Sequence, residues 1–178
     1  MSILTTDRLI ITKWQAGDWQ RLYAIMSDAE VMRYVGPYRP ITQKEARTFI
    51  DEKVQEQCRQ EPTTWSVRRK QSDDLVGYCG YSTRTYGEYL GETEIGWLLS
   101  RQYWNRGLMT EAASTVLRYG FEEYHLDTVI ASARPQNLGS LNVIKKIGMK
   151  SIGDSENPLG MPVPHFRMDG PHDLPGVR

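Results

Sequence analysis

The sequence predicts an α/β fold of the α+β type, a mixed and mostly antiparallel twisted sheet with helices on both faces. Short apolar runs typical of strands alternate along the chain with longer segments whose apolar residues recur every three or four positions, as in helices. Two strand-like runs, 64–69 and 75–82, flank a polar turn and predict a hairpin. The expected order is β-α-α-β-β-β-α-β-α-β, and it favours one sheet covered by helices. The 178 residues suit a single domain spanning 1–178.

Strands are expected where aliphatic, aromatic and β-branched residues gather between turn signals. These runs cover 8–14, 64–69, 75–82, 94–99, 128–133 and 150–153, with 165–168 as the only candidate in the proline-rich tail. Glycine, proline and polar residues predict loops at 36–40, 71–74 and 86–91.

Helices are expected at 16–26, in a short turn at 28–34, from Thr42 to residue 59 or 60, at 105–124, and from Asn137 to Ile147. Thr42 and Glu45 form a capping-box pattern at the start of the third of these. Asn137 is a good N-cap for the last helix, and Gly148 stands at its C′ position.

The helix at 105–124 follows the strand at 94–99 so closely that the chain must turn directly from strand into helix. A helix N-terminus exposes unpaired N–H groups and the positive end of the helix dipole. Gly107 lets a ligand approach the backbone, and Arg106 adds charge, so this turn predicts an anion site, most plausibly for phosphate. The alternative is a turn that binds nothing, since the stretch matches neither a Walker A loop nor a dinucleotide fingerprint.

Composition narrows the classes of partner. Lys plus Arg and Asp plus Glu each number 22, so the formal net charge is zero and nothing global attracts nucleic acid or an anionic membrane. No apolar run has the length of a membrane span, and the N-terminus lacks a signal-peptide pattern. Cys58 and Cys79 show no metal-ligand spacing, so we expect no metal and two free thiols in a reducing cytoplasm. The oligomeric state stays open, a homodimer included.

A cleft is expected beside the strand at 94–99. Gly96 interrupts this apolar strand, which indicates either a bulge or a close approach by a ligand. A molecule with phosphates on the 105–110 turn could run along this strand, and a cleft opens if the strands 94–99 and 128–133 splay apart. Asn137 and Ser140 begin the next helix and could reach the same region.

Four motifs in this order resemble the GNAT N-acetyltransferases, and among them the RimJ/RimL branch. They are Glu94-Ile95-Gly96-Trp97-Leu98-Leu99, then Tyr103-Trp104-x-x-Gly107-x-x-Thr110-Glu111-Ala112, then Asn137-x-x-Ser140, then Lys146-Ile147-Gly148-Met149. The opening Thr6-Asp7-Arg8-Leu9 and the run Ser27-Asp28-Ala29-Glu30-Val31 fit the same branch, so the resemblance extends from residue 5 to residue 153.

The resemblance implies acetyl transfer from acetyl-CoA to a primary amine, on a protein N-terminus or a small molecule. The pyrophosphate would lie on the 105–110 backbone and the pantetheine arm along strand 94–99. The implied cofactor-binding residues are Trp97, Leu98, Leu99, Trp104, Asn105, Arg106, Gly107, Leu108, Met109, Thr110, Asn137 and Ser140. The amine would enter from the opposite side, where we expect the loops 36–41 and 157–165 to line its path.

Three positions depart from the family pattern. Asn105 stands where a small residue is usual, and Met109 where Gly or Ala is usual, so Met109 is either the first core residue of its helix or crowds the pyrophosphate. Ile144 stands where many members carry a general-acid tyrosine. Ser140 either replaces that acid or is simply a polar first-turn residue. A non-catalytic module that binds CoA or an acyl-CoA therefore remains the alternative function.

The chemistry needs a base, an oxyanion donor and an acid. An alkyl amine has a pKa of about 10.4 and must lose a proton before attack. We assign the base to Glu94, with Glu92 or bulk water as alternatives. A backbone N–H near Gly96, at Trp97 or Leu98, would stabilise the oxyanion, and Ser140 would protonate the leaving thiolate.

Overall fold

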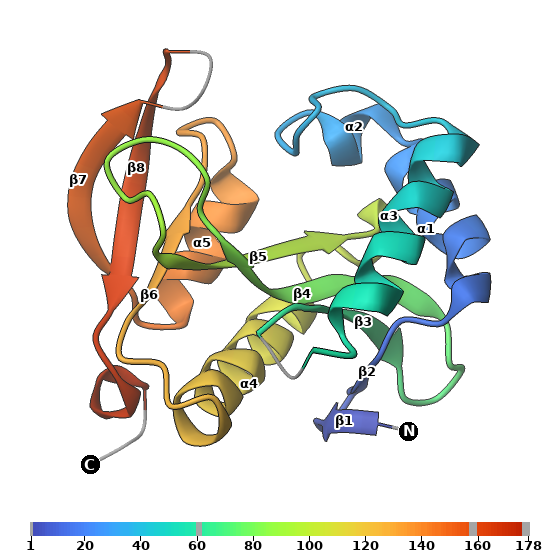
Figure 1. The fold of residues 1–178 in the computed structure, drawn as a ribbon, viewed down its shortest axis with the longest axis horizontal. Helices are drawn as coiled ribbons and strands as arrows, with labels where there is room; N and C mark the ends of the chain where they lie inside the picture. The colour runs from blue at the N-terminus through green and yellow to red at the C-terminus, as the bar shows by residue number, and fades with distance from the viewer. Residues whose placement is uncertain (1, 60–61, 157–159, 176–178) are drawn as a thin grey trace.

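The computed structural model describes residues 2–59, 62–156 and 160–175. Within these residues one sheet runs through the molecule in the order β1-β2-β3-β4-β5-β6-β8-β7 (Figure 1). The strands are β1 Ser2–Thr5, β2 Leu9–Thr12, β3 Thr64–Arg69, β4 Leu75–Thr83, β5 Thr93–Leu99, β6 Val129–Ser132, β7 Lys150–Glu156 and β8 Pro162–Met168. Each neighbouring pair is antiparallel except β5 and β6, which are parallel.

Helices cover both faces of the sheet, as the sequence predicts. They are α1 Trp19–Met26, α2 Ala29–Met32, α3 Gln43–Glu56, α4 Leu108–Glu123 and α5 Leu138–Lys146, with 3-10 turns η1 Ala16–Asp18, η2 Arg101–Tyr103 and η3 Pro171–Asp173. One core cluster joins α4 and α5 to the sheet, and a second joins α1, α2 and α3 to it. No helix among the described residues is long and apolar enough to cross a membrane.

The sheet opens between β5 and β6. These two strands share one registered pair, Glu94 opposite Ile130, although β5 continues to Leu99. β5 and β6 can lie parallel because α4 supplies the long crossover connection that parallel strands need. The predicted splay of these strands is therefore confirmed, and the fold class with it.

Three strands differ from the sequence prediction. β1 was not expected, because the four residues Ser2–Thr5 are too few to show a period; they become a strand by pairing with β2. β7 and β8 are longer than predicted because they pair with each other from Lys150 to Glu156. Pro162 and Pro164 in β8 argue against a strand when the sequence alone is considered, because proline cannot donate a ladder hydrogen bond.

Two features near the expected site also need correction. The helix predicted at 105–124 begins only at Leu108, because Asn105 and Gly107 have φ values of 58° and 71° that no α-helix contains. The pairing of β4 with β5 continues without a register shift through Gly80 and Gly96, so Gly96 marks no bulge. A Cβ added at Gly96 would have no neighbour within 4 Å, which leaves open space above this strand.

Candidate functional site

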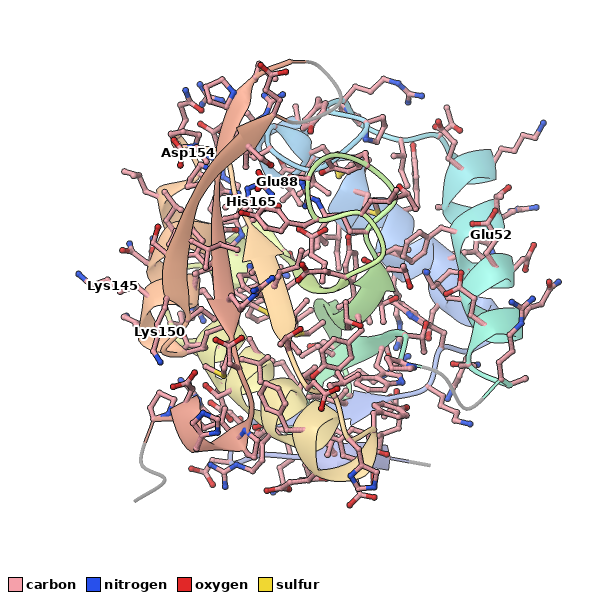
Figure 2. All side chains as sticks on the ribbon, turned by 60° about the vertical axis from the view of Figure 1, so that its left-hand side comes forward. Glu52, Glu88, Lys145, Lys150, Asp154 and His165 are labelled. Carbon is pink, nitrogen blue, oxygen red and sulfur yellow. The ribbon has the colours of Figure 1, made fainter. Side chains whose placement is uncertain are left out.

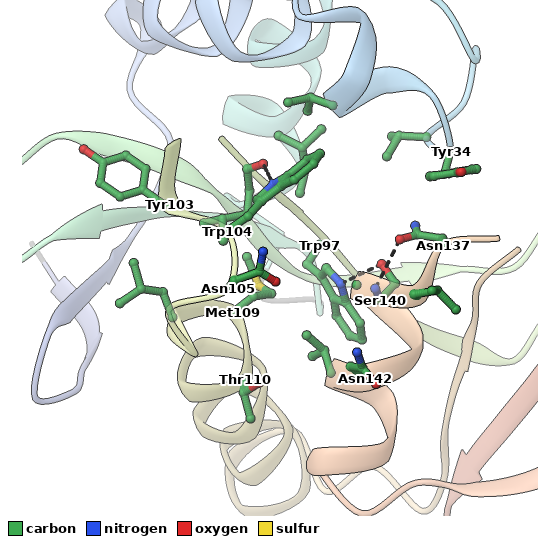
Figure 3. A pocket seen from close by; sticks show the side chains of 18 of the residues that line it. Tyr34, Trp97, Tyr103, Trp104, Asn105, Met109, Thr110, Asn137, Ser140 and Asn142 are labelled. Atoms are coloured by element: carbon green, nitrogen blue, oxygen red, sulfur yellow. Dashed lines mark hydrogen bonds between the residues drawn. The ribbon is translucent and has the colours of Figure 1, made fainter. Parts of the chain in front are cut away.

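A cavity of about 460 Å³ lies where the sheet opens (Figure 3). Its wall is built from the end of β5, the turn into α4, the start of α5, and α2 with the residues after it. Eleven of the twelve predicted cofactor-binding residues line it: Trp97, Leu98, Leu99, Trp104, Asn105, Gly107, Leu108, Met109, Thr110, Asn137 and Ser140. These residues come from three separate segments of the chain, which the fold brings to one place.

The turn at residues 105–110, which we call the anion loop, presents backbone donors beside this cavity. Asn105 and Gly107 both adopt left-handed conformations, and Asn and Gly are the residues that tolerate them best. None of the N–H groups of residues 105–110 has an acceptor among the described residues. Alternating left-handed residues before a helix N-terminus form a concave set of donors that suits an anion.

Met109 and Trp104 fix the position of the anion loop relative to β5. Met109 is 4% exposed and belongs to the core under α4, while it also borders the cavity. Trp104 donates its indole N–H to the carbonyl oxygen of Leu99 at 2.8 Å, and the ring is 39% exposed. The anion loop is therefore tied to the last residue of β5.

Ser140 lies at the start of α5, and one hydrogen bond orients its hydroxyl group. The Asn137 side chain accepts a hydrogen bond from the Ser140 N–H at 3.2 Å, which confirms Asn137 as the N-cap. The Trp97 indole N–H donates to Ser140 Oγ at 3.3 Å (Figure 3). Since that oxygen accepts from Trp97 and its O–H has no acceptor among the described residues, the Ser140 proton is free to be donated elsewhere.

Arg106 is the predicted residue that does not line the cavity. Its carbonyl oxygen accepts a hydrogen bond from Arg8 Nη1 at 2.8 Å, and its guanidinium lies 5.9 Å from the centre of the Tyr103 ring. Its charge is near the anion loop, but its side chain forms no part of the wall.

Glu94 also lies outside the cavity wall. Its Oε1 accepts hydrogen bonds from Arg84 Nη1 at 2.9 Å and from Ser132 Oγ at 2.6 Å. The Arg84 side chain is 0% exposed and that of Glu94 18% exposed. Because side chains alternate along a strand, Glu94 and Gly96 point to the same face of β5. The alternative base, Glu92, is held by two hydrogen bonds from Arg167 Nη2, at 2.8 and 2.9 Å.

The loops expected to line an amine path are placed only in part. No residue of 36–41 lines the cavity, although Tyr38 stacks 4.0 Å under the guanidinium of Arg134. Residues 157–159 lie outside the described residues, and His165 belongs to β8 rather than to a loop. Burial and the nearby charge of Arg84 lower the pKa of His165. The His165 ring centre lies 4.8 Å from that of Tyr89, and Figure 2 shows His165 close to Glu88.

The predicted cofactor-binding set leaves out eleven lining residues, most of which fall in two groups. Glu30, Val31, Tyr34 and Val35 come from α2 and the residues after it, and no local pattern places that segment beside β5. Gly139, Asn142, Val143 and Lys146 lie on one face of α5. Their spacing of three and four residues was readable, since it continues from Gly139 along the helix. The described residues contain no group of three or more His, Cys, Asp or Glu side chains arranged to hold a metal ion.

Known proteins resemble this chain over most of its length. A family model described as Acetyltransferase (GNAT) domain matches residues 8–150. The chain is 36% identical over 152 residues to the Bacillus subtilis (strain 168) protein named Uncharacterized N-acetyltransferase YnaD, covering 84% of each. A structure titled acetyltransferase (GNAT family) from Bacillus anthracis has a TM-score of 0.80 and 28% identity, covering 93% of this chain and 97% of that chain. RimL, a ribosomal L7/L12 alpha-N-protein acetyltransferase solved with coenzyme A, has a TM-score of 0.80 at 11% identity, covering 96% and 98%, which shows a shared fold alone.

Proposed function

Because the chain belongs to the GNAT acetyltransferase family, we propose that it moves an acetyl group from acetyl-CoA to a primary amine. The observation that carries this proposal is the anion loop, whose six consecutive N–H groups have no acceptor in the described structure and border a cavity of about 460 Å³. Six unpaired amides at a helix N-terminus fit the pyrophosphate of a CoA molecule.

The residues present fit the rest of that cofactor. The side of β5 that faces β6 is unpaired beyond Glu94, so the backbone groups of Trp97 and Leu99, which point to that side, are available to an amide-bearing arm. Bound acetyl-CoA would supply an acetyl thioester. Of the two expected donors to the acetyl oxygen, Trp97 N–H is the proposed one, because the Leu98 N–H points to β4 in the register that the Ser100 N–H bond to the Val76 carbonyl continues.

Ser140 is the proposed acid, in place of the tyrosine that Ile144 replaces. The bond from Trp97 occupies a lone pair of Ser140 Oγ and so directs its O–H away from the indole. Ser140 lines the cavity, where its proton can be donated to a leaving thiolate.

Glu94 is the proposed base, and it acts through a water molecule. Its Oε1 is occupied by Arg84 and Ser132, while Oε2 receives no hydrogen bond from the described residues. The open space above Gly96 lies on the same face of β5 as this carboxylate, so an amine approaching there has a base within reach of one water. Glu92, held by two bonds from Arg167, is the weaker candidate.

We further place the chain in the RimJ/RimL branch, as a single cytoplasmic domain over residues 1–178. The motifs quoted from the sequence support the branch, and two free cysteines suit a reducing compartment. One continuous sheet through the described residues supports a single domain. The acceptor is a protein N-terminus or a small-molecule amine. We propose no nucleic-acid or membrane partner, because the formal net charge is zero, and we leave a homodimer open.

A second function is a non-catalytic module that binds CoA or an acyl-CoA. The absence of a tyrosine at Ile144 is the observation that favours it. The two functions differ in whether free thiol appears when acetyl-CoA meets an amine.

The test has two arms. Calorimetry with acetyl-CoA and with CoA measures binding, and a thiol reagent follows turnover with a panel of peptides and small amines. We expect binding and acceptor-dependent thiol release. Binding without release for any amine would favour the non-catalytic module, and no binding at all would overturn both functions.

The Ser140→Ala variant tests the acid. We expect kcat to fall about 100-fold, the size of a general-acid contribution, with an unchanged Kd for acetyl-CoA. The matched control is Ser72→Ala, in the turn between β3 and β4 and outside the cavity wall, which should keep the parental kcat. A parental kcat for Ser140→Ala would leave Ser140 as a polar residue in the first turn of α5.

A further inference from the structure

The anion loop is tied to the N-terminal hairpin by one arginine. Arg8, between β1 and β2, donates from Nε to Glu111 Oε2 at 2.6 Å and from Nη1 to the carbonyl oxygen of Arg106 at 2.8 Å. Arg106 lies within the anion loop, and Glu111 lies in the first turn of α4. The planar fork of Arg8 therefore spans the loop from a residue inside it to the residue that follows it.

Glu111 is the anchor of this contact. Besides Arg8 Nε, its Oε1 accepts from the Arg8 backbone N–H at 3.0 Å and from Thr6 Oγ1 at 2.5 Å. Burial opposes its ionisation, yet these bonds from Thr6 and Arg8 lower the pKa of Glu111. The carboxylate stays charged and joins the turn between β1 and β2 to the start of α4.

Holding the Arg106 carbonyl also sets the direction of a loop amide. In a trans peptide the C=O and the next N–H point to opposite sides of the peptide plane. Since Arg8 holds the Arg106 oxygen, the Gly107 N–H must point away from Arg8. Gly107 lines the cavity and Arg8 does not. Glycine with φ at 71° is free to rotate this peptide, so an outside contact is needed to fix it.

We propose that Arg8 and Glu111 form a clamp that presets the anion loop for a phosphate-bearing ligand, with Arg8 as a positioning residue. The ligand class rests on the proposed function, a nucleotide-type cofactor with a pyrophosphate. The clamp itself is a property of the unliganded protein. Its effect is to hold the loop amides in their binding direction before the ligand arrives, which lowers the ordering cost of binding.

A clamp and a purely electrostatic effect of Arg8 and Glu111 predict opposite changes in CoA affinity when Glu111 is removed. A clamp needs Glu111, because Arg8 loses its anchor without it. Simple electrostatics would favour the loss of Glu111, because a negative charge leaves the neighbourhood of a bound phosphate. Glu111→Ala should therefore weaken CoA binding if the clamp operates and strengthen it if only charge matters. Alanine is a strong helix former, so α4 keeps its first turn.

The experiment measures Kd for CoA by calorimetry in the parent, Arg8→Lys, Arg8→Gln and Glu111→Ala. Lysine keeps the charge but cannot bridge a carboxylate and a carbonyl with fixed fork geometry. We expect each variant to raise Kd by about tenfold, because the loop must then be ordered when the ligand binds. KM for acetyl-CoA should rise and KM for the amine should stay unchanged.

The matched control is Lys150→Gln. Lys150 on β7 makes an ion pair of similar length with Asp173, 2.5 Å against 2.6 Å, at the far end of the sheet order from β1 (Figure 2). This variant should keep the parental Kd, so a general effect of removing a surface ion pair can be recognised. A parental Kd for Arg8→Lys, or a tighter one for Glu111→Ala, would overturn the clamp.

A second readout needs no ligand. Amide hydrogen exchange at residue 111, whose N–H donates to the Gly107 carbonyl oxygen at 3.1 Å in the unliganded protein, should become faster in Arg8→Lys than in the parent, because the loop and the first turn of α4 are no longer held. If the parent fails to bind CoA, the proposed function fails, while this exchange measurement still decides on the clamp. Unchanged exchange in Arg8→Lys and in Glu111→Ala would refute it.

Discussion

Glu94→Gln is expected to change two measurable quantities at once, and the structure says how to separate them. The carboxylate is the proposed base and also the charge partner of Arg84, whose side chain is 0% exposed. Removing one member of a buried ion pair strands the other and costs about 3–5 kcal/mol. Because Glu94 is 18% exposed, solvent moderates this cost, and we expect the lower end, about 3 kcal/mol.

The stability loss should appear as a fall in Tm of about 6–12 °C, from 2–4 °C per kcal/mol for a chain of this size. The catalytic loss should appear as a fall in kcat of about 100-fold at pH 7. KM for acetyl-CoA should stay near its parental value. The kcat deficit should shrink as pH approaches the amine's own pKa of about 10.4, because the amine then loses its proton without help.

The double variant Arg84→Met, Glu94→Gln separates the two effects. Replacing both members of a buried pair by neutral groups is often close to neutral for stability, so we expect recovery to within about 1 kcal/mol of the parent. The kcat deficit should remain. Denaturant unfolding and thiol release are the two assays. A double variant that regains parental kcat would show that Glu94 acts only by holding Arg84. A single variant with parental kcat at pH 7 would leave Glu92 or water as the base.

Three further outcomes follow from burial. Gly120→Ala should lower the free energy of unfolding in urea by about 2–3 kcal/mol, because the new Cβ would lie 2.1 Å from the Tyr81 hydroxyl. Adding Tyr81→Phe should restore part of this stability, and parental stability of Gly120→Ala would contradict the packing. Burial lowers the pKa of His165, so the unfolded state takes up the His165 proton first as pH falls below about 6.5. The free energy of unfolding should therefore decrease as pH drops from 7 to 5. His165→Gln should flatten this dependence of stability on pH, and an unchanged dependence would exclude His165 as its source. Cys58 is exposed and should react quickly with a thiol reagent, whereas Cys79, whose pKa burial raises, should react only on unfolding; two fast thiols would show that the core opens.

Local signals were sufficient for most elements. The capping box of Thr42 and Glu45, the N-cap at Asn137 and the left-handed Gly148 after α5 all occur where the sequence predicts them. Each involves residues within a few positions of one another, so short-range hydrogen bonds and φ preferences decide them. The strand-to-helix turn at 105–110 was visible for the same reason.

Local signals failed where pairing decides the structure. β1 exists because β2 offers an edge, and β7 and β8 lengthen because each is the other's partner. The left-handed φ of Asn105, read from the sequence as a departure, accommodates the turn beside Gly107. No residue pattern within one segment predicts which strands pair or how this turn is folded.

The sequence by itself determined the helices, most of the strands and the segment that presents free amides, because these depend on periodicity and caps. Only the tertiary structure decided the contacts that would give the site its chemistry. Arg8 meets Glu111 across 103 positions of sequence, Trp97 meets Ser140 across 43, and Arg84 meets Glu94 across the β4–β5 connection. Such contacts depend on where packing places whole elements, and burial, which sets the strength of each charge and hydrogen bond, exists only after the chain has folded.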